Sequence, residues 1–124
     1  MNILIVDDTD LVRDLIRDLL TPLPLPTCIV EASDVPQALS ILGRWQPDVV
    51  TLDLQLPGGS GLNVLQAIKQ AGLHSRVIVL TSLTEPRIWQ ACFEAGAAFV
   101  LDKSSDLEQL PDILRTIADL RENA

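Results

Sequence analysis

The stretch Asp48-Val49-Val50-Thr51-Leu52-Asp53-Leu54-Gln55-Leu56-Pro57-Gly58-Gly59 decides the fold. It is a short β-branched run that leads into Asp53, and a Pro-Gly-Gly turn follows a few residues later. Such a run, bounded by a turn, predicts a strand that is buried on both faces of a sheet. The strand would place Asp53 at the carboxyl edge of that sheet, where ligands collect in open α/β folds. Because burying a bare carboxylate is costly, we expect Asp53 to be hydrated, paired or bound to a metal ion.

The composition is that of a globular protein. The chain has 124 residues, of which 48% are hydrophobic and 21% charged, and we expect residues 1–124 to form a single domain. No apolar run approaches the roughly 20 residues that a bilayer span needs. The amino terminus lacks the features of a signal peptide, so we expect a cytoplasmic protein without membrane contact, with Cys28 and Cys92 as buried thiols. The net charge of −8 disfavours nucleic-acid binding by this domain.

Strands and helices alternate along the whole chain. Apolar and β-branched runs predict five strands, at residues 2–6, 27–30, 48–52, 76–80 and 97–101. The segments that follow the strands carry apolar residues at helical spacing, which predicts five helices. Short connections between alternating strands and helices imply a parallel sheet with helices on both faces. The sequence therefore predicts a doubly wound α/β sandwich.

The helix boundaries can also be predicted. Asp10 suits the N-cap of the first helix, Ser33 or Asp34 that of the second, and Thr84 that of the fourth. The first helix should end before a short, stiff connector that contains Pro22, Pro24 and Pro26.

Polar side chains follow four of the predicted strands. Asp7 and Asp8 end the first strand, Asp53 the third, Thr81 the fourth and Lys103 the fifth. In a parallel sheet these ends meet at one edge, so three carboxylates, a hydroxyl and an ammonium should converge. Close carboxylates repel each other unless a cation intervenes, and oxygen ligands with retained waters favour Mg²⁺. A carboxylate can also attack phosphorus to give an aspartyl phosphate, whose charge the metal ion and Lys103 would stabilise.

Five short motifs at these positions carry a family resemblance. They are Val6-Asp7-Asp8, Asp53-Leu54-Gln55-Leu56-Pro57 with Gly61, Thr81-Ser82, Glu94-Ala95-Gly96-Ala97, and Lys103. In this order and spacing, the chain resembles the response-regulator receiver domains of two-component signalling over nearly its whole length. The resemblance implies a flavodoxin-like (βα)5 fold with strand order 2-1-3-4-5, and a switch that is controlled by phosphorylation.

The resemblance also implies roles for single residues. Asp53 would accept the phosphoryl group of a phosphohistidine on a sensor histidine kinase or phosphotransfer protein. Asp8, Asp53 and the Gln55 backbone carbonyl would hold Mg²⁺ directly, and Asp7 would act partly through water. Thr81 and Lys103 would contact the phosphoryl group. The domain would thus be no general enzyme, and would catalyse only its own phosphotransfer and dephosphorylation.

The output of the switch is predicted on the same basis. Phe99 would rotate inward as Thr81 moves, and the surface of the fourth helix, fifth strand and fifth helix would then change. The predicted partner-surface residues are Ile88, Ala91, Ala95 and Phe99. The recipient would be a downstream protein or an effector domain outside this chain, and a homodimer is possible.

Two positions depart from the family pattern. The family usually has proline, often after a cis peptide, where Ser104 follows Lys103. A cis bond without proline costs about 2.5–4 kcal/mol, which leaves the geometry of this peptide open. The switch position is Phe99 instead of tyrosine. Because Phe99 has no hydroxyl to fix its inward state, we predict a less sharply two-state switch.

Two other functions fit the predicted sheet edge less well. A phosphohydrolase of the haloacid dehalogenase kind needs a second acid two residues after the nucleophile, where this chain has Gln55. A flavin-binding module would need hydroxyl-rich phosphate loops, whereas the loop after the first strand is acidic. Taken alone, several residues could also have purely structural roles. Lys103 could be a solvated lysine, Thr81 a strand-end cap, and Phe99 and Trp89 packing residues.

Overall fold

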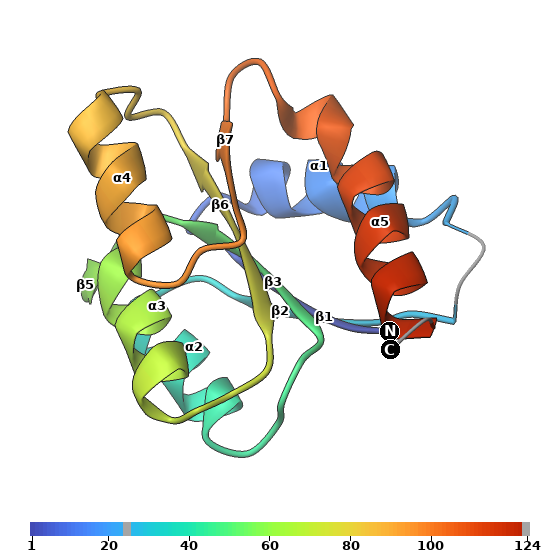
Figure 1. Ribbon diagram of the computed structural model, residues 1–124, viewed down its shortest axis with the longest axis horizontal. Helices are drawn as coiled ribbons and strands as arrows, with labels where there is room; N and C mark the ends of the chain where they lie inside the picture. The colour runs from blue at the N-terminus through green and yellow to red at the C-terminus, as the bar shows by residue number, and fades with distance from the viewer. Residues whose placement is uncertain (24–25, 123–124) are drawn as a thin grey trace.

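A five-stranded parallel sheet forms the centre of the computed structural model, which describes residues 1–23 and 26–122 (Figure 1). Its strands are β1 (Asn2–Val6), β2 (Cys28–Ala32), β3 (Val49–Asp53), β6 (Arg76–Thr81) and β7 (Phe99–Asp102). They lie in the order β2-β1-β3-β6-β7, and every neighbouring pair is parallel. This order is the predicted 2-1-3-4-5 arrangement, so the fold prediction is confirmed.

Helices cover both faces of the sheet (Figure 1). On one face lie α1 (Asp10–Leu20) and α5 (Leu110–Glu122), which contact each other. On the other face lie α2 (Val35–Leu42), α3 (Gly61–Gln70) and α4 (Pro86–Glu94). The buried side chains form two clusters, one under each helical layer, because successive residues of a strand point to opposite faces. The predicted sandwich is therefore doubly wound.

Strand β3 runs through the middle of the sheet, and all of its residues are buried. The β-branched run thus forms the predicted fully buried strand. The turn that follows contains a short antiparallel hairpin, β4 (Gln55–Leu56) with β5 (Gly59–Ser60), which the sequence analysis did not predict. Gly58 and Gly59 take φ angles of 81° and 145°, a region that favours glycine. The hairpin ends at Ser60, which caps α3.

Two of the predicted helix caps are wrong by one residue. The N-cap of α1 is Thr9, so Asp10 is the first helical residue, and Glu85 instead of Thr84 is the N-cap of α4. Neither Thr9 nor Glu85 makes a side-chain capping bond, so the preference for a capping side chain did not decide these boundaries. At α2 the prediction is confirmed, because the Asp34 side chain accepts a hydrogen bond from the Gln37 N–H group.

The two cysteines differ in exposure. Cys92 on α4 is buried, as predicted, but Cys28 is exposed. Cys28 is the first residue of β2, which is an edge strand of the sheet, so that prediction was wrong for a topological reason. In the predicted proline connector, Pro22 and Pro26 are exposed, whereas Pro24 lies outside the described residues.

The segment between β7 and α5 contains the Lys103–Ser104 peptide, whose cis or trans geometry the sequence left open. No peptide bond between described residues is cis, so this bond is trans. The Asp102 carboxylate accepts hydrogen bonds from the Ser104 N–H and hydroxyl groups, at 2.9 and 2.7 Å. A short 3₁₀ turn, η1 (Leu107–Gln109), then leads into α5. Within residues 1–23 and 26–122, the structure has no helix of the length and apolarity that a membrane span requires.

Candidate functional site

The carboxyl end of β1 supplies two carboxylates in different environments. Asp7 is 1% exposed, whereas Asp8 is exposed to solvent. The Asp7 N–H group donates to the Ala32 carbonyl and so extends the pairing of β1 with β2 by one residue. Its side-chain Oδ1 accepts a hydrogen bond of 2.9 Å from the Thr9 N–H group. Strand pairing therefore fixes Asp7 at the carboxyl edge of the sheet, and Asp8 is the first residue of the loop that follows.

Asp53 is the last residue of β3 and is 4% exposed. Its Oδ1 accepts a hydrogen bond of 3.0 Å from the Gln55 N–H group, and its Oδ2 lies 2.9 Å from Lys103 Nζ. Burial raises the pKa of Asp53 above its ordinary value, and the hydrogen bonds from Gln55 and Lys103 offset only part of that rise. Asp53 is thus a partly desolvated carboxylate at the predicted position.

Lys103 joins the carboxylates of two strands. It follows β7, and its backbone N–H group donates to the Thr81 carbonyl at 2.9 Å. Its Nζ lies 2.6 Å from Asp7 Oδ2 and 2.9 Å from Asp53 Oδ2. Burial by itself would lower the pKa of Lys103, but the hydrogen bonds and charges of the two carboxylates outweigh burial and raise it. Lys103 is therefore a charged ammonium, not a solvated surface lysine.

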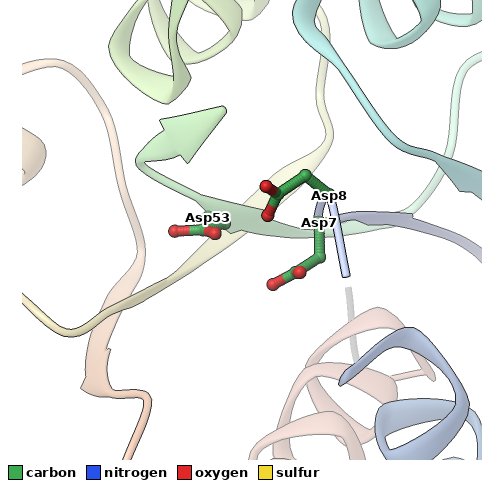
Figure 2. Close-up of side chains that lie close together, drawn as sticks. All are labelled: Asp7, Asp8 and Asp53. Carbon is green, nitrogen blue, oxygen red and sulfur yellow. The ribbon is translucent and has the colours of Figure 1, made fainter. Parts of the chain in front are cut away.

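Three carboxylates meet at this edge of the sheet (Figure 2). Asp7, Asp8 and Asp53 each offer one carboxylate oxygen, and these oxygens lie within 4.8 Å of one another. The buried Asp7 Oδ2 is ion-paired with Lys103, yet it makes no well-formed hydrogen bond within the described part of the chain. One ammonium does not balance three carboxylates, and hard oxygen donors at this spacing suit a divalent cation such as Mg²⁺. The residues present therefore fit the predicted metal ion.

Thr81 ends β6 beside this cluster. It is fully buried, and its Oγ1 accepts a hydrogen bond of 3.0 Å from the Leu83 N–H group. In the register of the sheet, Asp53 pairs with Leu80, the residue before Thr81. The Thr81 hydroxyl keeps its own hydrogen for a further acceptor. Thr81, Lys103 and the three carboxylates thus share one edge, as the strand pattern predicted.

The predicted switch and partner-surface residues lie further from the cluster. Phe99 begins β7 and is half-buried against the core beneath α1 and α5. Ile88 and Ala95 pack on the opposite core, beneath α2, α3 and α4, and Ala91 is also half-buried. The roles of these four residues stay predictions.

The two large aromatic side chains of α4 differ in exposure. Trp89 is half-buried, and its Nε1 donates to the Leu83 carbonyl at 2.8 Å, which agrees with a packing role. Phe93, which lies one turn after Trp89 on α4, is 50% exposed.

Arg13 is a site neighbour that the sequence analysis missed. Helical spacing assigns it to the polar side of α1, but its side chain is only 13% exposed. Its Nη1 donates a hydrogen bond of 2.6 Å to the Asp7 carbonyl, and its Nε donates to Glu31 at 3.1 Å. The one sequence feature that pointed to Arg13 is its positive charge near three acidic residues. The periodicity of α1 does not show how far this side chain reaches.

Comparison with known proteins adds an independent observation. The family model described as the response regulator receiver domain matches residues 3–115. The nitrate/nitrite response regulator protein NarP of Escherichia coli is 36% identical over 113 residues, which cover 91% of this chain and 53% of NarP. Sporulation initiation phosphotransferase F of Bacillus subtilis is 31% identical over 121 residues, which cover 98% of this chain and 96% of that protein. The chain therefore spans about half of the first relative and nearly all of the second.

Solved structures agree with this family. The signal receiver domain of the putative response regulator NarL from Mycobacterium tuberculosis superimposes with a TM-score of 0.82 at 30% identity, covering 94% of this chain and 95% of that one. The response regulator domain of Thermotoga maritima CheB gives a TM-score of 0.80 at 28% identity, covering 96% and 94%. The fold, the acidic edge and these similarities lead to one conclusion: the chain belongs to the response-regulator receiver domains of two-component signal transduction.

Proposed function

We propose that Asp53 is the phosphoacceptor of this receiver domain and that its phosphorylation depends on Mg²⁺. The observation that carries the proposal is the double contact of Lys103 Nζ with Asp7 and Asp53, beside a third carboxylate from Asp8. This arrangement combines a nucleophilic carboxylate, a fixed cation and a cluster of oxygen ligands at one edge of the sheet.

The phosphoryl donor would be a phosphohistidine on a sensor histidine kinase or a phosphotransfer protein. The Asp53 carboxylate attacks phosphorus, a new O–P bond forms, and the P–N bond to the donor imidazole breaks with its electron pair left on nitrogen. Lys103 already lies against the Asp53 carboxylate and would neutralise charge on the transferred group. The Thr81 hydroxyl would donate a hydrogen bond to a phosphoryl oxygen.

Asp8 and Asp53, with the Gln55 carbonyl, would hold Mg²⁺ directly, and Asp7 would act partly through water. When bound, the ion supplies positive charge that stabilises the phosphoryl oxygens during transfer. The hydrogen bond from the Gln55 N–H group to Asp53 Oδ1 supports this assignment, because it ties the proposed carbonyl ligand to the acceptor. The domain would then catalyse only its own phosphorylation and dephosphorylation.

The output would be a change in the surface that is formed by α4, β7 and α5. Thr81 would move toward the phosphoryl group, and Phe99 would turn inward. These movements would change the surface around the half-buried Ile88, Ala91 and Ala95, which a partner would then contact. The recipient would be a downstream protein or an effector domain, and the phosphorylated domain is a candidate homodimer. The net charge of −8 supports output through protein contact instead of direct nucleic-acid binding by this domain.

Chemical mapping of the acceptor tests the proposal. The protein is incubated with Mg²⁺ and phosphoramidate, whose P–N bond mimics phosphohistidine, and is then reduced with borohydride, which converts an aspartyl phosphate to homoserine. Peptide mass spectrometry should find the homoserine at position 53 only. Homoserine at position 7 or 8 would contradict the assignment of the acceptor, and unmodified peptides throughout would contradict phosphorylation itself.

A further inference from the structure

Arg13 connects three parts of the structure that surround the carboxylates of β1. Its Nη1 donates to the Asp7 backbone carbonyl at 2.6 Å, and its Nε donates to Glu31 on β2 at 3.1 Å. It also pairs with Asp10, one turn earlier on α1. With its side chain only 13% exposed, Arg13 is largely enclosed by these partners. It is thus a packed guanidinium with several hydrogen-bond acceptors, and not a solvated charge.

The bond to the Asp7 carbonyl has a geometric consequence for Asp8. The carbonyl of Asp7 belongs to the planar peptide unit that joins Asp7 to Asp8. The N–H group of Asp7 is bonded to Ala32, and the Asp7 side chain is bonded to Thr9 and paired with Lys103. Arg13 adds the contact that fixes the plane of the next peptide. That plane determines the position of the Asp8 Cα atom. It therefore also determines the direction in which the exposed Asp8 side chain leaves the loop.

The charge of Arg13 would by itself disfavour a cation nearby. Removal of a positive charge next to Asp7 should strengthen cation binding, and Asp10 would lose its pairing with Arg13, whereas Glu31 keeps Arg17 as a partner. A positioning role predicts the opposite, because a displaced Asp8 carboxylate would no longer meet the Asp53 carboxylate. The two effects have opposite signs, so the direction of a change in affinity decides between them.

We propose that Arg13 is a positioning residue for the cation site, and that it holds the Asp7–Asp8 peptide so that the Asp8 and Asp53 carboxylates face one ion. The inference rests on the proposed function, because it assumes that the acidic cluster binds Mg²⁺. It adds a role for a residue on α1 that contacts neither the acceptor nor the ion. Groups that hold metal ligands in place commonly contribute about ten-fold or more to metal affinity.

The test is Mg²⁺ titration by calorimetry of the wild type, Arg13→Gln and Arg17→Gln. Arg17 is the matched control, because it also lies on α1, also pairs with Glu31, at 2.7 Å, and loses the same charge when replaced. It makes no contact with Asp7 among the hydrogen bonds of the described residues. Thermal unfolding of each variant confirms that it is folded before its affinity is compared.

We expect Arg13→Gln to weaken Mg²⁺ binding by about ten-fold, and Arg17→Gln to leave it within about two-fold of the wild type. Mg²⁺ binding by Arg13→Gln that is as tight as in the wild type or tighter, or equal losses of affinity in both variants, would overturn the positioning role but leave the Mg²⁺ site intact. No heat of Mg²⁺ binding in the wild type would overturn the metal site and the inference together. If Arg13→Gln does not fold, Arg13→Lys takes its place, since it keeps the charge but lacks the planar fork, and a fall of at least about three-fold is expected.

Discussion

At the scale of single residues, the site depends on one ammonium between two buried carboxylates. The raised pKa of Asp53 means that this group contributes stability below its ordinary pKa of 3.8, and that the contribution is lost as the pH rises through the folded value. The raised pKa of Lys103 means that its contribution is complete below 10.5 and is lost only above that pH. Between these limits, Lys103 offsets the cost of the ionised Asp53.

Replacement of Lys103 by methionine should therefore destabilise the protein in a pH-dependent way. At about pH 7 the variant keeps two buried carboxylates without their cation, and we expect the free energy of unfolding to fall by roughly 3 kcal/mol. At about pH 4.5 the loss should be smaller, because the pKa of Asp53 rises further without Lys103 and the carboxyl group takes up a proton. Urea unfolding of both proteins at the two pH values measures the difference. A loss of the same size at both would contradict this account of the ion pair.

Thr51 offers a second test at this scale. It is 1% exposed in the middle of β3, and its hydroxyl has no hydrogen-bond partner in the described part of the chain. Because a buried hydroxyl without a partner is costly, Thr51→Val should raise the free energy of unfolding by about 1 kcal/mol. Thr81→Val is the control, since the Thr81 hydroxyl accepts a bond from Leu83, and its loss should destabilise by about 1 kcal/mol. Chemical denaturation of both variants should give changes of opposite sign, and destabilisation by Thr51→Val would refute the argument.

At the scale of secondary-structure elements, the contact between the end of β3 and the start of α3 keeps Asp53 in place. A Cβ atom at Gly61 would lie 2.2 Å from the Asp53 carbonyl oxygen and 2.7 Å from the Leu54 Cα. Both neighbours are backbone atoms, so neither can turn aside. Only glycine allows α3 to begin so close to Asp53.

We predict that Gly61→Ala lowers the free energy of unfolding by about 3 kcal/mol through this overpacking. Gly43→Ala is the matched control, because a Cβ there would meet its nearest atoms at an ordinary 3.5 Å and the φ angle is −71°. That variant should stay within about 0.5 kcal/mol of the wild type. Thermal unfolding compares the two variants. If Gly61→Ala were as stable as the wild type, β3 and α3 could separate without a cost in stability, which would contradict the prediction.

The sequence was most informative about elements whose pattern is local. The β-branched run of β3 and the alternation of strands with helices predicted the sheet and both helical layers. Since all strands of a parallel sheet end at one edge, the same pattern also predicted that Asp7, Asp53 and Lys103 would meet. The family motifs added the strand order and predicted roles for these residues.

Features that depend on tertiary contacts were not predictable in the same way. Cys28 is exposed because β2 lies at the edge of the sheet, which its apolar neighbours do not reveal. Arg13 looked like a surface residue because helical spacing assigns a side to a residue but does not show how far its side chain extends. The hairpin of β4 and β5 consists of two-residue strands, which are too short to give a periodic pattern.

At the scale of the whole molecule, the fold separates Asp53, the proposed acceptor, from the predicted output surface. The acidic cluster lies where β1 and β3 end, while Phe99 lies at the start of β7. The α4 residues of the predicted partner surface belong to a helix that contacts β7. A signal from Asp53 would travel through Thr81, at the end of β6, and through its neighbour β7. The acidic cluster and the predicted output surface are thus joined by adjacent strands of one sheet.

The most direct test of the central claim is the intact mass of the protein after incubation with acetyl phosphate and Mg²⁺. Parallel samples contain EDTA or the Asp53→Asn variant. The account predicts a gain of one phosphoryl group in the wild type with Mg²⁺, and no gain in either parallel sample. A gain in Asp53→Asn equal to that of the wild type, or a wild type that stays unmodified with Mg²⁺ and a cognate phosphorylated kinase as donor, would contradict it.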